Sequence, residues 1–177
     1  MPRREKDSNC SYCGTAFAPA ADWPRTCAAC GSTAYRNPLP VAIALLPVRD
    51  GTGTGLAVIR RTIEPGRGLL ALPGGFIDHG ETWEQAVVRE LAEETGIAAA
   101  AADPVLADTL TDPEGGFLLV FGLLPLREAA GLPASVPTDE TEGWEVLRAP
   151  AELAFPLHTL AVHRWFDGEY DGRATRP

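Results

Sequence analysis

The sequence predicts one α/β domain that follows a small cysteine-rich segment. Three observations point to this organisation. All four cysteines lie between Met1 and Arg36, aliphatic runs typical of strands begin after Asn37-Pro38, and one well-capped helix lies among those runs. A chain of 177 residues, 45% of them hydrophobic, is long enough to form one ordinary domain core and a small appendage.

The aliphatic part of the chain predicts a set of short strands and a closing helix. The GTGTG stretch at 51–55 lacks the lysine and the following helix of a phosphate-binding loop, so we interpret it as the tip of a hairpin. Residues 128–138 are expected to form a loop. Short apolar runs bounded by turn residues predict strands at 41–48, 56–61, 69–72, 106–111, 117–124 and 144–147, and the run at 159–166 is expected to close the domain as a helix.

The best-defined element is a helix expected at about residues 84–95. Thr82 and Gln85 have the capping-box spacing at its start. Gly96 follows Thr95 as the residue that ends the helix in a left-handed conformation.

This helix and the residues just before it carry five glutamates: Glu81, Glu84, Glu90, Glu93 and Glu94. At about 100° per residue, Glu90 and Glu94 lie about 40° apart and Glu93 about 60° to the other side, so these three share one arc. An ordinary solvated acidic face is the alternative, but such faces usually mix lysine with glutamate, and this one has none. Hard oxygen ligands grouped in this way suit Mg²⁺ or Mn²⁺, and Gly74 just upstream offers a free carbonyl.

The four cysteines form two Cys-x-x-Cys-Gly pairs, Cys10 with Cys13 and Cys27 with Cys30. This spacing lets both thiolates of a pair reach one tetrahedral ion, so the two pairs predict a closed, structural Zn²⁺ site. Two disulfides and a rubredoxin-like iron are the alternatives. A segment this small has little core, so metal binding is expected to supply much of its folding free energy.

The charge and the apolar pattern restrict the partners. A formal net charge of -9 argues against nucleic acid as a routine partner, but not against a small phosphorylated substrate that binds with a divalent metal. No signal peptide and no apolar run long enough to span a membrane is visible. We therefore expect a cytoplasmic protein with reduced thiols and no membrane association.

The segment from Gly75 to Ile97 resembles the Nudix box at every defined position. Gly75 is followed after five residues by Glu81, and after seven more by RELAEETGI at 89–97. The cysteine pattern likewise resembles a zinc ribbon. The resemblance implies an α/β/α sandwich around a mixed sheet at residues 37–170, a zinc ribbon at 1–36 and a flexible tail at 171–177. It also implies hydrolysis of a nucleoside diphosphate linked to another moiety, with Mg²⁺ or Mn²⁺.

The resemblance also implies roles for individual residues. Glu93 and Glu94 would be direct metal ligands, Glu90 a ligand or a group acting through bound water, and the Gly74 carbonyl a further ligand. Arg89 and Glu81 would pair and hold the preceding loop against the helix.

Other candidate residues lie outside the box. The base that accepts the proton of the attacking water would be Glu90 or Glu140, which matches a late loop glutamate of the family. Arg60 and Arg61 are candidates for phosphate contact. Trp144 could stack on a base, although packing on the sheet is its more ordinary role.

The substrate is less sharply predicted than the reaction. A zinc ribbon before such a domain resembles NADH pyrophosphatases, but their Ser-Gln-Pro-Trp-Pro-Phe-Pro type of stretch is missing after Ile97. Pro113, about sixteen residues past the box, is similar to a mark of ADP-ribose-type members and would also suit an ordinary turn. Mutator-type nucleoside triphosphatases and a nucleotide-sensing module that does not cleave its ligand remain alternatives. The apolar strand edges of such domains leave a homodimer open.

Overall fold

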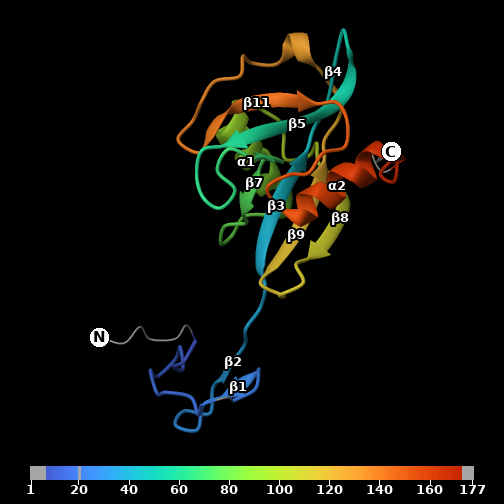
Figure 1. Ribbon diagram of the computed structural model, residues 1–177. Helices are drawn as coiled ribbons and strands as arrows, with labels where there is room; N and C mark the ends of the chain where they lie inside the picture. Colours follow the sequence, from blue (N-terminus) through green and yellow to red (C-terminus); the bar gives the residue numbers. More distant parts are fainter. Residues whose placement is uncertain (1–6, 20, 173–177) are drawn as a thin grey trace. The chain divides into compact units, whose positions relative to one another are not determined.

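The computed structural model describes residues 7–19 and 21–172 (Figure 1). It divides into two compact units, Met1–Pro38 and Leu39–Pro177, whereas the sequence analysis placed the boundary after Arg36. Most of the expected tail at 171–177 lies outside the described residues. Within the described part of the chain, no helix is long and apolar enough to cross a membrane.

The first unit is built from two similar turns and one small antiparallel sheet. Strands β1 (Arg25–Thr26) and β2 (Thr33–Ala34) pair with each other. The Arg25 guanidinium lies 4.4 Å from the Trp23 ring centroid, and it donates hydrogen bonds to the carbonyls of Ala21 and Asp7. With so little apolar packing, this unit depends on its turns and on the four cysteines that those turns carry.

The second unit holds two sheets and two α-helices. The first sheet has the order β7-β3-β9-β8, in which only β3 and β9 run parallel. The second has the order β10-β4-β5-β11, with β6 also on β5, and only β10 and β4 run parallel. The elements are β3 Leu39–Leu45, β4 Pro47–Asp50, β5 Gly53–Arg61, β6 Leu70–Ala71, β7 Gly74–Phe76, α1 Trp83–Thr95, β8 Val105–Thr111, β9 Phe117–Leu123, β10 Arg127–Glu128, η1 Ala129–Gly131, β11 Thr141–Leu147 and α2 Pro156–Phe166.

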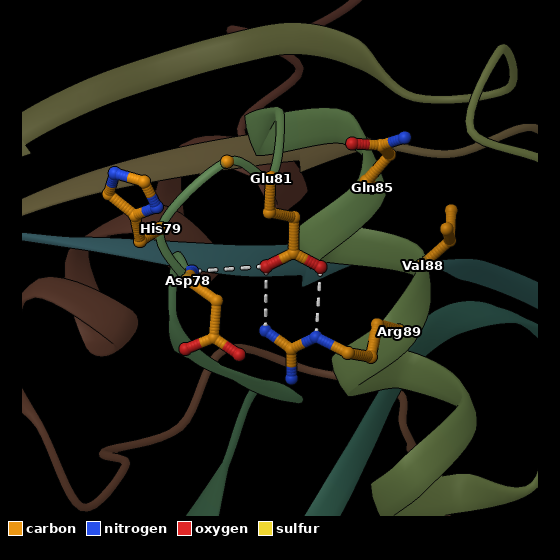
Figure 2. Close-up of a pocket in the computed structure, with 7 residues that line it drawn as sticks. Asp78, His79, Glu81, Gln85, Val88 and Arg89 are labelled. Carbon is orange, nitrogen blue, oxygen red and sulfur yellow. Dashed lines mark hydrogen bonds and ion pairs between the residues drawn. The ribbon is translucent and has the colours of Figure 1, made fainter.

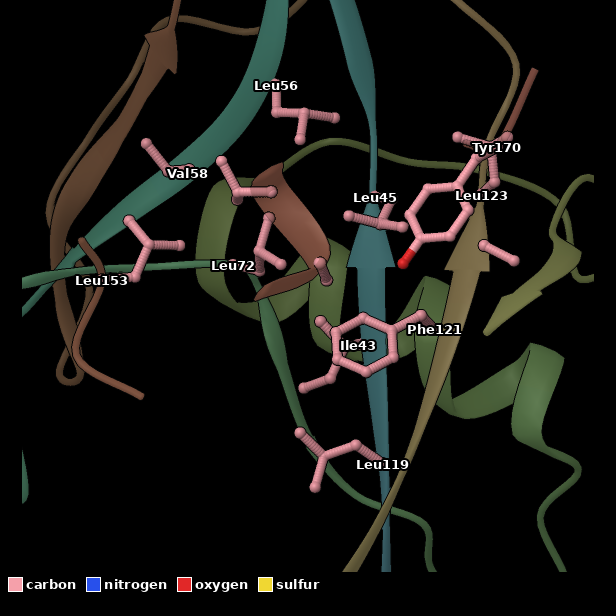
Figure 3. Packing of buried hydrophobic residues seen from close by; sticks show 13 residues of the cluster. Ile43, Leu45, Leu56, Val58, Leu72, Leu119, Phe121, Leu123, Leu153 and Tyr170 are labelled. Carbon is pink, nitrogen blue, oxygen red and sulfur yellow. The ribbon is translucent and has the colours of Figure 1, made fainter. Parts of the chain in front are cut away.

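Strand β3 separates the two halves of the hydrophobic core. Its residues alternate between two buried clusters, as expected for a strand that is covered on both faces. Ile43 and Leu45 pack in the cluster that includes α2, and Figure 3 shows Ile43 beside Phe121 of β9 and Leu45 beside Leu123 of the same strand. Ala42 and Ala44 point to the cluster that includes α1. The helices therefore cover opposite faces, which confirms the predicted α/β class with a mixed sheet.

Helix α1 packs closely on its sheet because the facing residues are small. Ala42 and Ala44 present only methyl groups, and Gly122 of β9 presents no side chain at all. A Cβ atom built at Gly122 would lie 2.9 Å from Cγ2 of Val87, closer than real contacts allow. This close packing fixes the height of α1 above the sheet, and with it the position of the glutamates on the helix.

Most predicted elements are confirmed, with differences at their ends. The helix begins at Trp83, with Thr82 and Gln85 in a reciprocal capping box, and ends at a left-handed Gly96. The run at 41–48 is divided into β3 and β4, and the hairpin tip is shorter than GTGTG because β5 already begins at Gly53. The predicted loop at 128–138 contains the end of β10 and η1, and the closing helix begins at Pro156 rather than Thr159.

Candidate functional site

Three elements bring the acidic residues together. Helix α1 contributes its glutamates, β7 contributes Gly74 and Gly75, and the turn before β11 contributes Glu140. They surround a pocket of about 540 Å³. The pocket is lined by Arg61, Ile63, Gly74, Gly75, Phe76, Glu90, Glu93, Glu94, Thr138, Asp139 and Glu140.

Glu94 is the most deeply buried of these acids, with 4% of its surface exposed. Its Oε2 accepts a hydrogen bond of 2.9 Å from the Gly74 amide. Burial, together with the neighbouring charges of Glu90 and Glu140, raises the pKa of Glu94 to about 8. A carboxylate removed from water in this way is stabilised in its ionised form by a nearby cation.

Glu90 and Glu93 lie about one helical turn apart, and both accept hydrogen bonds from the Arg89 guanidinium. Arg89 Nη1 donates to Glu90 Oε1 at 2.7 Å and to Glu93 Oε2 at 3.0 Å. Burial also raises the pKa of Glu90. The Glu90 carboxylate lies directly against Gly75, where a Cβ atom would be 2.3 Å from Oε1, so only glycine leaves room for it.

Arg89 joins the helix to the loop before it. Figure 2 shows its guanidinium paired with Glu81, with Nε 2.9 Å from Oε1 and Nη2 3.0 Å from Oε2. Nη2 also donates to the Phe76 carbonyl, and Glu81 accepts the Asp78 amide at 3.1 Å. Only 29% of the Arg89 side chain and 15% of the Glu81 side chain are exposed. This pair is therefore better shielded from water than an ordinary surface salt bridge.

Glu140 reaches the pocket from a turn with a fixed backbone. The Thr62 amide donates to the Glu140 carbonyl at 2.8 Å, and the Glu140 amide donates to Thr138 Oγ1 at 3.2 Å. The Thr141 hydroxyl donates to the Glu94 carbonyl at 3.1 Å, which ties this turn to the end of α1. Among the described residues, no side chain donates a hydrogen bond to the Glu140 carboxylate, so it remains available to a ligand.

A second, mostly apolar pocket of about 380 Å³ adjoins the first. The two share Arg61, Gly74 and Phe76. Arg61 Nε donates to the Pro65 carbonyl at 2.8 Å, and its guanidinium lies 5.1 Å from the Phe155 ring centroid. The cation is therefore held at the boundary between the acidic and the apolar pocket.

The four cysteines of the first unit converge on one point. Their sulfur atoms all lie within 4.8 Å of one another. Cys10 and Cys30 are 3.7 Å apart and Cys13 and Cys27 3.6 Å, close to the roughly 3.8 Å expected between sulfurs at about 2.3 Å from one tetrahedral Zn²⁺. All four are free thiols in this structure.

The backbone around the cysteines is that of a metal-binding knuckle. The amides of Gly14 and Gly31 donate at 2.9 Å to the carbonyls of Cys10 and Cys27, and both glycines have positive φ. Hydrogen bonds from Thr15 lower the pKa of the Cys13 thiol to about 6, which favours the thiolate that binds metal. The donor set and its spacing fit a zinc ion. Among the described residues of the second unit, the glutamate oxygens do not converge to the same degree.

The chain matches the family model described as the NUDIX domain over residues 38–167. This chain belongs to the Nudix family. Its matched region contains both helices, all strands of the second unit, and every residue of the acidic pocket.

Two curated Nudix relatives are similar in sequence. An ADP-ribose pyrophosphatase of Methanocaldococcus jannaschii is 35% identical over 117 residues, which cover 64% of this chain and 68% of that protein. An NAD-capped RNA hydrolase NudC of Salmonella heidelberg is 33% identical over 89 residues, half of this chain. The match spans only 33% of the NudC chain.

Solved structures confirm the Nudix fold. A NUDIX hydrolase from Nitrosomonas europaea aligns with a TM-score of 0.71 at 20% identity and covers 96% of both chains. The NUDIX domain of Shewanella oneidensis NrtR, crystallised with ADP ribose, aligns with a TM-score of 0.62 at 22% identity over 75% of this chain and 89% of that one. At these identities the similarity concerns the fold alone.

Of the other candidate residues of the Nudix domain, Arg61 lines the acidic pocket, and Arg60 and Trp144 do not. The Nη2 of Arg60 pairs with Glu145 at 3.1 Å and its Nη1 donates to the Gly68 carbonyl. Trp144 packs against the cluster beneath α1 and lines neither pocket. The sequence analysis did not single out Phe76 or His158, because no spacing rule links residues from β7 and α2.

Proposed function

We propose that this Nudix domain is a Mg²⁺- or Mn²⁺-dependent hydrolase of the diphosphate linkage in ADP-ribose or a similar nucleoside diphosphate derivative. The observation that carries the proposal is the pocket in which three box glutamates, Glu140 and Arg61 face one space. Its acidic part suits metal ions, and Arg61 at its edge suits a phosphate. The relative named as an ADP-ribose pyrophosphatase supports this class of substrate.

The acidic pocket fits divalent metal ions by its donor set. Glu90, Glu93, Glu94 and the Gly74 carbonyl would hold them, because carboxylate and carbonyl oxygens are the ligands that Mg²⁺ and Mn²⁺ prefer. When bound, such ions polarise phosphoryl oxygens and lower the pKa of a water molecule. The raised pKa of Glu94 fits this assignment, since a buried carboxylate without a cation is costly.

Other residues of the chain would accept the proton, orient the diphosphate and position the glutamates. Glu140 accepts the proton from the attacking water, because its carboxylate is free whereas that of Glu90 is bound by Arg89. Water adds to one phosphorus atom, the bridging P–O bond breaks, and the other phosphate leaves with the bridging oxygen. Arg61 orients the diphosphate from the opposite edge of the pocket. Arg89 and Glu81 keep the glutamates and β7 in position.

Three other functions compete with this one. The relative named as an NAD-capped RNA hydrolase supports NADH or another substrate with a dinucleotide group, and a nucleotide-sensing module that does not cleave its ligand is the second alternative. A mutator-type triphosphatase would use the same acidic pocket. The complete set of box glutamates favours an enzyme over a sensor, and the apolar pocket beside the metals favours a substrate with a bulky group on its diphosphate.

The test is hydrolysis of a substrate panel in the presence of Mg²⁺ or Mn²⁺. The panel comprises ADP-ribose, NADH, sugar nucleotides and nucleoside triphosphates, with products separated by chromatography. Glu93→Gln should abolish turnover, whereas Glu84→Gln in the first turn of the same helix should retain it. Turnover by Glu93→Gln at the wild-type rate would contradict the proposed metal site, and exclusive cleavage of triphosphates would contradict the substrate class.

For the first unit we propose a zinc ribbon, at residues 1–36, that holds one structural Zn²⁺ through Cys10, Cys13, Cys27 and Cys30. Cysteines that hold a metal ion as thiolates suit a reducing compartment, and on this ground we propose a cytoplasmic location. Metal analysis of the purified protein should give one zinc per chain. Cys13→Ser should lose it, and Ser11→Ala in the same turn should keep it. Wild-type protein with neither zinc nor iron would contradict the proposal.

A further inference from the structure

The apolar pocket is continuous with the acidic pocket. The two share Arg61, Gly74 and Phe76, so a substrate whose diphosphate lies among the glutamates has the apolar pocket directly beside it. The volume of about 380 Å³ is within the range of roughly 300–1,000 Å³ that is typical of small-molecule sites. What occupies this pocket is therefore expected to be a group attached to the diphosphate.

The walls of the apolar pocket suit a planar ring better than a sugar. Three phenylalanines line it, Phe76, Phe117 and Phe155, together with aliphatic side chains from β3, β9 and α2. Phe76 and Phe117 have ring centroids 6.2 Å apart, and they are 53% and 41% exposed, unusually high for large aromatic side chains. A planar ligand at this position would cover aromatic surface that is otherwise in contact with water.

One buried polar side chain of this pocket has a hydrogen-bonding position left over. His158 is 4% exposed, and its Nδ1 accepts the Leu72 amide at 3.2 Å. Burial lowers the pKa of His158 to about 3, so the ring is neutral and carries its proton on Nε2. Within residues 7–19 and 21–172, no acceptor is found for this Nε2–H. His158 lines the pocket, so this donor is available to an atom of a bound ligand.

The acidic residue that lines the apolar pocket, Asp112, already has a backbone partner. An Asp112 carboxylate oxygen accepts the Phe117 amide at 2.5 Å, which closes the turn between β8 and β9. Arg61 is held by Pro65 and Phe155 at the phosphate side. His158 is thus the buried polar side chain of the apolar pocket that has a hydrogen-bond donor left for a ring.

We infer that the apolar pocket binds the adenine ring of the substrate and that His158 donates a hydrogen bond from Nε2–H to one of its ring nitrogens. This inference rests on the proposed function, because the continuity of the two pockets links the ring to the diphosphate. Adenine has three ring nitrogens, N1, N3 and N7, that can accept this bond. A ribose offers hydroxyl groups but no aromatic face for the phenylalanines.

The test is binding, which does not depend on turnover. Titration calorimetry with Mg²⁺ would compare AMP, ribose 5-phosphate and the 1-deaza, 3-deaza and 7-deaza analogues of AMP. Wild-type protein should bind AMP about 10-fold tighter than ribose 5-phosphate. One deaza analogue should bind about 3- to 10-fold more weakly than AMP, the range for one neutral hydrogen bond.

Two matched variants assign this difference to His158. His158→Asn retains an oxygen that can accept the Leu72 amide but lacks Nε2–H, so it should bind AMP and the sensitive analogue equally. His163→Asn, at an exposed position of the same helix, should behave as wild type. Equal binding of AMP and ribose 5-phosphate, equal binding of all analogues by wild type, or full discrimination by His158→Asn would overturn the inference. If the protein hydrolyses its substrate but does not discriminate between the nucleobase analogues, only the adenine-site inference is overturned. If it discriminates between the analogues but hydrolyses nothing, only the proposed function is overturned.

Discussion

Arg89 and Glu81 hold each other through two parallel hydrogen bonds of 2.9 and 3.0 Å. The same guanidinium binds the Phe76 carbonyl of β7 and, through Nη1, the carboxylates of Glu90 and Glu93. One side chain therefore links the loop before α1, the strand that carries Gly74 and Gly75, and the acidic pocket. The fork geometry of arginine makes these bonds simultaneously, which a lysine ammonium cannot do.

Arg89→Lys should therefore reduce both activity and stability. We expect kcat/KM to fall by about 100-fold, because a small displacement of the glutamates has a large effect on rate. The free energy of unfolding in urea should fall by about 1–3 kcal/mol, since Glu81 is left with fewer partners. Arg49→Lys is the matched control, because Arg49 pairs with Glu128 where both side chains are more than half exposed. That change should cost less than about 1 kcal/mol. Equal effects of the two substitutions would show that Arg89 is an ordinary surface cation.

Glu140, in the turn before β11, and Glu142, in β11 itself, are two residues apart and offer a test of the proposed base. Glu140 lines the acidic pocket, whereas the Glu142 side chain is 61% exposed and faces Arg60 at 4.0 Å. Glu140→Gln should lower kcat by about 10²- to 10⁴-fold with little change in KM, as expected for loss of a general base. Glu142→Gln should leave kcat unchanged. If Glu90→Gln lowers kcat more than Glu140→Gln and alone removes the acidic limb of the pH–rate profile, where activity rises as the base loses its proton, Glu90 is the base.

The elements that the sequence predicts well are those with local signals. Thr82, Gln85 and Gly96 fix both ends of α1 through hydrogen bonds within a few residues, so their spacing suffices to locate the helix. The cysteine pairs are similar, since each knuckle closes on itself. The closing helix was placed three residues late because Phe155 makes no side-chain cap, although Pro156 at the first helical position was an available signal.

The apolar pocket could not be predicted because its residues meet only through the tertiary fold. Its walls come from β3, β9, α2 and the loop before β6, which are far apart in the chain. The position of Arg60 could not be predicted either, because it too depends on the tertiary fold. Adjacent residues of a strand point to opposite faces, so Arg60 and Arg61 cannot both face the pocket, and the sequence alone did not indicate which of them does.

His158 should make the protein less stable in mild acid. Burial and the nearby charge of Arg61 lower its pKa from 6.5 to about 3 in the folded state. The unfolded chain therefore binds a proton that the folded chain does not, and stability falls as the pH drops below about 6.5. From this group alone, the loss between about pH 7 and about pH 5 is roughly 2 kcal/mol.

Urea unfolding of wild type and His158→Asn across this pH range measures the effect. The difference in unfolding free energy between the two should shrink by that amount as the pH falls, because the variant lacks the titrating ring. Glu94, whose raised pKa acts in the opposite direction, is present in both proteins and cancels in the comparison. A difference that stays constant from about pH 7 to about pH 5 would mean that His158 binds its proton as readily in the folded protein as in the unfolded chain.

Gly74 and Gly75 are adjacent, and their substitution should have opposite consequences. A Cβ atom at Gly74 would lie 2.4 Å from the Ala42 carbonyl oxygen, a backbone atom of β3 that cannot move without disturbing the sheet. Gly74→Ala should therefore lower the free energy of unfolding by about 1–3 kcal/mol, the usual range for forcing extra atoms into a packed site.

A Cβ atom at Gly75 would instead meet the Glu90 carboxylate, with Oε1 at 2.3 Å. That group is at the end of a flexible side chain, so Gly75→Ala should displace it with less than about 1 kcal/mol of lost stability. Turnover should nevertheless fall by about 10-fold or more, because the displaced carboxylate no longer faces the acidic pocket. Thermal melting and kcat, measured on both variants, separate the two effects. Gly75→Ala with wild-type kcat would exclude Glu90 in its present position from the reaction, whereas a stable and active Gly74→Ala would contradict the close contact between β7 and β3.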